Sequence, residues 1–107
     1  MQAPLLTNLS RLYAVQVSYN PGSIAANTVA ADGAAVAVPG VRPGDIIIAV
    51  KPTQTAGLAP VAARVSAEGQ VTVAFANATA GAINAGAEVW QFLVATPDPN
   101  LLNSIPA

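Results

Sequence analysis

The sequence predicts an all-β protein: a small antiparallel β-sandwich of the jelly-roll kind with an extended arm at each end. Short apolar segments, β-branched or alternating with polar residues, recur about every ten residues and are separated by glycine and proline. No amphipathic helix stands between them to join parallel strands. The chain of 107 residues has the length of one domain, which we place at residues 11–96, with arms at 1–10 and 97–107.

The first strand is predicted over residues 11–19. Tyrosine and valine alternate there with smaller or polar residues, which is typical of a strand with one buried and one exposed face. Asn20-Pro21-Gly22 then ends the strand with strong turn chemistry.

Residues 23–38 leave two interpretations open. Their alanine-rich beginning is compatible with a helix that Ser23 could cap. Indifferent helix formers within the segment, and the hairpin signal Asp32-Gly33, favour two short strands instead, at 25–30 and 34–38. We adopt the two strands.

Residues 46–50 are expected to form the central strand. Three consecutive isoleucines and a valine stand between a Pro43-Gly44 turn and a Lys51-Pro52 stop. Because β-branched side chains suit a pleated surface, we expect this strand to be covered on both faces. Residues 53–59 are small and polar, which predicts the longest surface loop and a candidate contact surface.

Three alternating strands complete the predicted sandwich, at residues 60–66, 71–75 and 88–95. In the last of them Trp90 and Phe92 share one face, and such a pair forms core more often than a stacking platform for sugars or bases. The other face of this strand is also largely apolar, so we expect one of its faces to meet another subunit.

The composition argues against nucleic acid and for protein partners. Charged residues make up 8% of the chain, the net charge is −1, and the four basic residues are scattered, whereas phosphate binding needs clustered lysine and arginine. A chain with 53% hydrophobic residues and so little charge is best explained if partners cover part of its surface. No apolar run reaches the roughly 18 residues of a membrane span. The first residues lack the features of a secretory signal, so we expect the protein to stay in the producing cell or in a particle assembled there.

The residue types that carry chemistry are scarce, and we predict no enzyme, no cofactor and no metal site. The chain has no histidine and no cysteine, which excludes a Ser-His-Asp triad and thiolate metal ligands. The five acidic residues are far apart in sequence, and three of them adjoin glycine or proline in predicted turns. Neither a calcium-binding loop nor a phosphate-binding glycine loop is present.

Five segments between residues 41 and 96 carry a resemblance to a known class of proteins. In chain order they read GDIII (44–48), GL (57–58), VAARVSA (61–67), VTVAFANAT (71–79) and AGAEVW (85–90). Together they resemble a module of structural proteins of tailed bacteriophages, and the chain is similar to the small β-sandwich proteins that serve as head decoration or cement proteins. The module spans about half of the chain and contains no catalytic signature.

The resemblance implies a non-enzymatic virion protein on the exterior of the capsid, made in the cytoplasm of a bacterial host. Its implied role is to stabilise contacts between subunits of the major capsid protein. The implied partners are that capsid protein and further copies of the chain, as a homodimer or homotrimer, with neither nucleic acid nor membrane involved. The resemblance transfers no functional residues, so the candidate contacts come from the two arms and the last strand: Leu5, Leu6, Leu9, Trp90, Leu101, Leu102 and Ile105.

A second hypothesis is a tail-associated or fibre module that binds a receptor. Related modules also occur in phage tail and fibre proteins. In this hypothesis the predicted loops at residues 53–59 and 77–86 would meet the host surface. It implies a few copies of the protein per virion, whereas decoration of the head implies hundreds.

Overall fold

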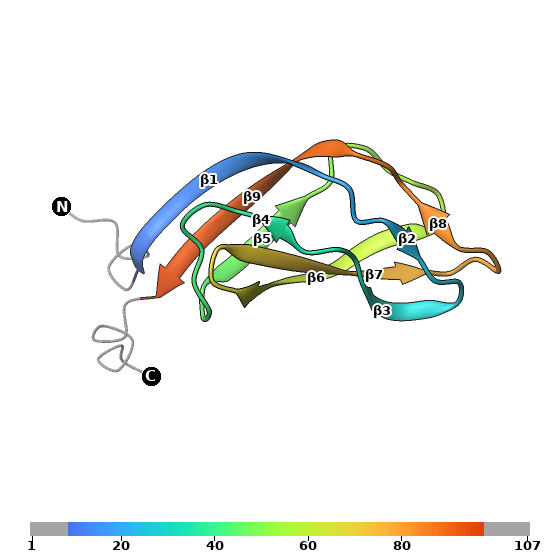
Figure 1. Ribbon diagram of the computed structural model, residues 1–107, viewed down its shortest axis with the longest axis horizontal. Coiled ribbons are helices and arrows are strands. Elements are labelled where there is room, and N and C mark those ends of the chain that lie inside the picture. The colour runs from blue at the N-terminus through green and yellow to red at the C-terminus, as the bar shows by residue number, and fades with distance from the viewer. Residues whose placement is uncertain (1–8, 98–107) are drawn as a thin grey trace.

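The computed structural model of the protein describes residues 9–97, which form nine β-strands and, within that range, no helix (Figure 1). The strands are β1 (Leu9–Tyr19), β2 (Ser23–Ile24), β3 (Thr28–Asp32), β4 (Val36–Ala37), β5 (Ile46–Val50), β6 (Leu58–Ala67), β7 (Gln70–Asn77), β8 (Ile83–Asn84) and β9 (Glu88–Pro97). All pairings between these strands are antiparallel. The all-β sandwich prediction is confirmed, and strand β1 begins two residues before the predicted boundary of the arm.

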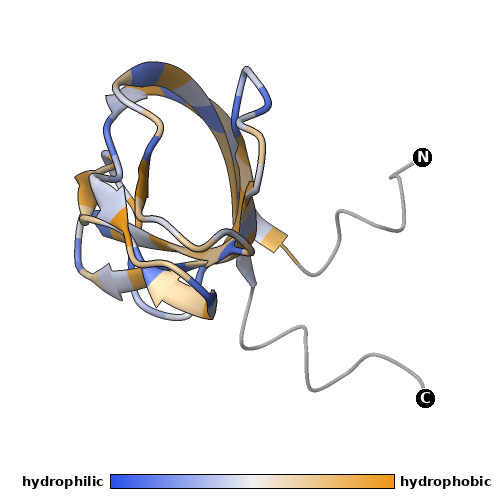
Figure 2. Ribbon diagram, turned by 90° about the vertical axis from the view of Figure 1, so that its right-hand side faces the viewer, coloured by the Kyte–Doolittle hydropathy of each residue, from blue (hydrophilic) through white to orange (hydrophobic). Residues whose placement is uncertain are grey.

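The strands form two main sheets. In the first sheet β9 lies between β1 and β5, and in the second β7 lies between β6 on one side and β3 and β4 on the other. The short pair β2 and β8 forms a separate two-stranded ladder. Figure 1 shows β1 and β9 above β6 and β7, and Figure 2 shows from the end how the two layers curve around a shared interior.

The core lies between the two middle strands, β7 and β9. Alternate residues of β9 point inward, and Trp90, Phe92 and Val94 are fully buried. The Trp90 ring meets Tyr19 edge-on at 5.1 Å between ring centroids and is stacked with Phe92 at 6.2 Å. Burial raises the pKa of Tyr19 to about 12, and its hydroxyl donates a hydrogen bond to the carbonyl of Ala34 at 2.7 Å. The predicted alternation of residues 88–95 therefore describes this strand correctly.

The isoleucine-rich strand β5 is an edge strand, so the prediction that it is central and covered on both faces is wrong. It pairs only with β9, and while Ile47 packs against the core, Ile46 and Ile48 are 53% and 54% exposed. The strand covered on both faces is β7, in which residues 71–75 are all buried. Strand β7 has neighbours on both sides, whereas β5 has a hydrogen-bonded neighbour on one side only.

Residues 25–38 form neither a helix nor a hairpin. Strands β3 and β4 lie one after the other along the same edge of β7, and between them the Gly33 N–H donates to the Val73 carbonyl at 2.9 Å. A Cβ at Gly33 would come within 2.9 Å of the Tyr19 hydroxyl and 3.0 Å of the Phe75 ring. The glycine after Asp32 is therefore explained by close packing over the core, and the predicted hairpin turn is wrong.

Strand β6 begins earlier than predicted and is irregular. Leu58, which the sequence placed in a surface loop, starts the strand and is only 6% exposed. A bulge between Pro60 and Ala62 shifts the register, so that Val61 is 52% exposed although it was predicted to share a face with Ala63. The candidate contact loop at residues 53–59 is correspondingly shorter.

Candidate interaction surface

The outer face of the first sheet concentrates exposed apolar side chains, and we call it the apolar face. Side chains of β1, β5 and β9 alternate between the core and this outer face. Its large apolar residues, between 38% and 55% exposed, are Leu12, Ile46, Ile48, Val50, Val89 and Leu93. Among the residues that the structure describes, only Val29 and Val61 are other large hydrophobic residues of comparable exposure.

The strand register makes the apolar face continuous. Three rows of outward residues cross the sheet from β1 through β9 to β5: Leu12-Ala95-Ile46, Ala14-Leu93-Ile48 and Gln16-Gln91-Val50. Directly opposed residues of an antiparallel pair have Cβ atoms about 5 Å apart, so the side chains in each row touch. The first two rows are wholly apolar, and the third adds two amide groups.

The outer face of the second sheet has a different character. There Arg64 on β6 and Asp32 on β3 form two parallel hydrogen bonds of 3.0 and 2.8 Å, both side chains being at least half exposed. The hydrogen bond from Arg64 lowers the pKa of Asp32. The second sheet thus carries charged side chains on its outer face, although it also exposes Val29 on β3 and Val61 on β6. Among the described residues, the apolar face carries no charged side chain.

A buried carboxylate fixes the beginning of β5. The Asp45 side chain is 3% exposed and accepts hydrogen bonds from the Arg11 guanidinium at 3.2 Å and from the Thr96 hydroxyl at 2.9 Å. It also accepts from the backbone N–H of Arg42 at 3.0 Å. These contacts attach the turn before β5 to both β1 and β9.

A second ion pair fixes the end of β5. Lys51 donates to the Glu88 carboxylate at 2.6 Å and to the Thr55 hydroxyl at 3.0 Å, and its side chain is 5% exposed. The Thr53 hydroxyl donates to the other oxygen of Glu88. Both ends of the edge strand are therefore attached to its neighbours, which holds Ile46, Ile48 and Val50 in place on the apolar face.

Acid is expected to weaken the fold through Glu88. The hydrogen bonds from Lys51 and then Thr53 lower the pKa of this carboxyl below its ordinary value of 4.5. Its contribution to stability is therefore complete above pH 4.5 and is lost as the pH falls through the lower folded-state pKa. Urea unfolding at pH 7 and pH 3 should show a smaller loss of stability in Glu88→Gln than in the unchanged protein.

Asp32→Asn is the matched control for this titration. Its partner Arg64 also lowers the pKa of Asp32, but both side chains of this pair are exposed and screened by solvent. We expect Asp32→Asn to change the acid sensitivity less than Glu88→Gln does. The reverse order would contradict a structural role for the Lys51–Glu88 pair.

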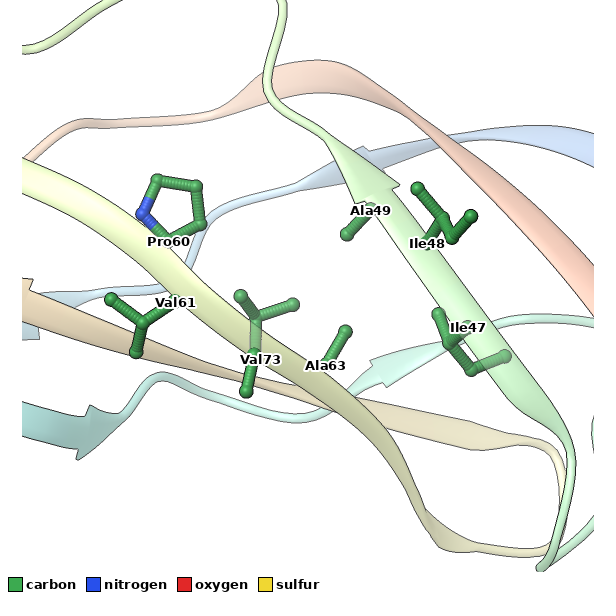
Figure 3. A pocket seen from close by; sticks show the side chains of 8 residues that line it. Ile47, Ile48, Ala49, Pro60, Val61, Ala63 and Val73 are labelled. Carbon is green, nitrogen blue, oxygen red and sulfur yellow. The ribbon is translucent and has the colours of Figure 1, made fainter.

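The described residues include a hollow that is lined by apolar side chains and not by reactive ones. It has a volume of about 210 Å³ and opens between β5 and β6 (Figure 3), and its lining residues are Ile47, Ile48, Ala49, Pro60, Val61, Ala62, Ala63 and Val73. None of these residues is an acid, a base or a nucleophile. Within residues 9–97 no three acidic side chains lie close enough to hold a metal ion, and no helix is long and apolar enough to cross a membrane. Burial of apolar surface is what this arrangement can provide.

The predicted contact residues fall into three groups. Trp90 is fully buried, so its prediction as a contact residue is wrong, and its interpretation as core is right. Leu9 belongs to β1, where it pairs with Pro97. The other predicted contacts lie outside the described residues: Leu5, Leu6, Leu101, Leu102 and Ile105.

Sequence reasoning missed the residues of the apolar face. The usable signal was the presence of apolar residues on both faces of residues 88–95 and throughout residues 46–50. In β9 it led to the expectation of a subunit contact, and the face concerned is the one with Val89 and Leu93. In β5 the same signal was interpreted as burial within the chain.

Comparison with known proteins identifies no relative: no protein-family model, curated protein or solved structure matches this chain. The functional argument therefore rests on the apolar face and on the resemblance carried by the sequence.

Proposed function

We propose that the protein is a non-enzymatic decoration, or cement, protein of a tailed-phage head. It binds the outer surface of the capsid and stabilises contacts between subunits of the major capsid protein. The single observation that carries this proposal is the apolar face, an uncharged sheet surface with six half-exposed large hydrophobic residues. The sequence resemblance supplies the identity of the partner.

The apolar face is large enough to drive docking. Burying the exposed half of an isoleucine, leucine or valine side chain contributes about 1 kcal/mol. The six residues together contribute on the order of 6 kcal/mol before the cost of lost translation, rotation and side-chain freedom. The face alone therefore supports a weak contact, and additional contact area would strengthen it.

The end of the sheet from which the two arms continue supports additional contact area beside the apolar face. Leu9 at the start of β1 pairs with Pro97 at the end of β9, so both arms join the sheet at the same end. The wholly apolar row Leu12-Ala95-Ile46 crosses the sheet near that end. The segments that the sequence predicts as arms therefore continue from the end of the sheet at which this row lies.

A charge in the middle row of the apolar face tests the proposal. Ile48 lies in the middle row, and Ile48→Lys would place an unpaired ammonium in the contact, where burial without a partner is costly. We expect binding to heads prepared without this protein to weaken at least tenfold. Co-sedimentation of purified protein with those heads measures the change.

Val29→Lys is the matched control, because Val29 on β3 is 82% exposed and lies outside the apolar face. This variant should bind heads as the unchanged protein does, and thermal unfolding should show that both variants are folded. Equal binding by Ile48→Lys and Val29→Lys would overturn the docking surface. A count of only a few copies per purified virion would favour the tail or fibre hypothesis over head decoration.

A further inference from the structure

One edge of β1 has no neighbouring strand among residues 9–97. Strand β1 is the longest of the described strands, with 11 residues, and of these strands it pairs only with β9. None of the backbone hydrogen bonds in the described turns and loops involves a residue of Leu9–Tyr19. Within the described chain, the N–H and C=O groups on that edge therefore have no backbone partner. Such an edge is a template for pairing with another strand.

The sheet edges formed by β5 and β6 carry features that prevent pairing, and β1 lacks them. Strand β6 contains Pro60 and two register shifts, and β5 has only five residues and lies beside β6. In β1 the only irregularity lies between Leu9 and Arg11. From residue 12 to residue 19 the register is unbroken, and the segment LYAVQVSY contains no proline, glycine or charge.

The neighbouring segment does not use this edge. Tyr13 and Tyr19 donate hydrogen bonds from their hydroxyls to the carbonyls of Pro39 and Ala34, at 3.0 and 2.7 Å. Both contacts are made by side chains on the inner face of β1. The backbone groups along its edge take no part in them.

We infer that β1 pairs antiparallel with β1 of a second copy of this chain. The two copies would be related by a two-fold axis perpendicular to the sheet, which gives one six-stranded sheet in the order β5-β9-β1-β1-β9-β5. A second copy fits because residues 12–19 are uncharged, so no like charges oppose each other in any register. In this arrangement the two apolar faces lie on the same side of the dimer.

This inference goes beyond the proposed function and does not depend on it. When the same edge of both copies forms the contact, no such edge is left for a third copy. The pairing therefore gives a dimer and not the trimer that the sequence resemblance also implied. A dimer would present twice the apolar area to one partner surface. It would also join two weak contacts into a single bivalent one.

Cysteine cross-linking tests the pairing, because the chain has no cysteine of its own. Ala14→Cys, Gln16→Cys and Ser18→Cys place thiols at exposed outward positions of β1, so the fold should tolerate them. Residues on the same face oppose each other across the axis, and opposed Cβ atoms lie within disulfide range. We expect rapid oxidation to a covalent dimer in at least one variant or pairwise mixture, at a rate at least tenfold above that of Ile48→Cys.

Light scattering on the full unchanged chain provides the second measurement. The expected mass is twice 10.6 kDa and falls toward 10.6 kDa on dilution. A monomer at all concentrations, a trimer, or faster cross-linking of Ile48→Cys than of the β1 variants would overturn the inference. Head binding is measured separately with Ile48→Lys, so a failed dimer leaves the docking proposal intact, and the reverse also holds.

Discussion

Trp90→Ala is expected to destabilise the protein by about 4 kcal/mol, because truncating a buried tryptophan leaves a large cavity. Trp90 is fully buried, and its ring meets the edges or faces of Tyr19, Phe75 and Phe92 at centroid distances of 5.1, 5.9 and 6.2 Å. Small domains have only about 5–15 kcal/mol of stability, so this loss removes much of the total. Urea unfolding followed by circular dichroism measures it, since the variant has lost its only tryptophan.

Trp90→Phe tests the contribution of the aromatic ring to stability separately from that of the indole N–H group. The Nε1 atom of Trp90 is buried and has no hydrogen-bond partner among the described residues, so its removal does not break a bond. Phenylalanine also keeps most of the aromatic contacts. We expect it to cost less than half as much as alanine. Equal losses for the two variants would show that the core depends on the indole and not on filled volume.

Alternation along the chain was the most reliable guide to the fold. The direction of a strand side chain follows from its position in the sequence, with a period of two residues. For this reason the placement of Trp90 and Phe92 together on a core face of residues 88–95 was predicted correctly, although Trp90 was also expected among the contact residues. The strands themselves were placed within a few residues wherever alternation was clear.

Sheet order could not be predicted, because it depends on pairing between distant segments. A run of β-branched residues such as Ile46–Val50 is equally suited to a strand buried within one chain and to an edge strand with an apolar outer face. Asp32-Gly33 has the residues of a hairpin turn, but β7 pairs with the strands on both sides of it. The apolar face is hidden from sequence reasoning for the same reason, because apolar residues in a strand predict a core whether the side chains turn out to be buried or exposed.

Asn77→Ala is expected to cost about 3 kcal/mol, because it removes all hydrogen bonds of a fully buried side chain and leaves the buried carbonyl of Ile24 without this partner. Asn77 ends β7 and is fully buried. Its amide nitrogen donates to the carbonyls of Ile24 and Gly81, each at 3.0 Å. Its amide oxygen accepts from the N–H of Thr79 at 3.0 Å and from the Thr79 hydroxyl at 2.8 Å. One side chain thus joins β2 to the loop after β7.

Thr79→Ala isolates one part of this network. Of the polar groups involved it removes only the hydroxyl, together with the side-chain methyl group, and the hydroxyl oxygen also lies 2.8 Å from the carbonyl oxygen of Gly81. Thr79 is partly exposed, so water can replace its hydroxyl, and the expected cost is about 1 kcal/mol. Urea unfolding of both variants gives the comparison. Equal costs would mean that the hydroxyl contact dominates the network. A threefold difference would place the stability of this end of the sandwich in the bonds that Thr79→Ala leaves intact, which are the two that Asn77 donates and the one it accepts from the Thr79 N–H.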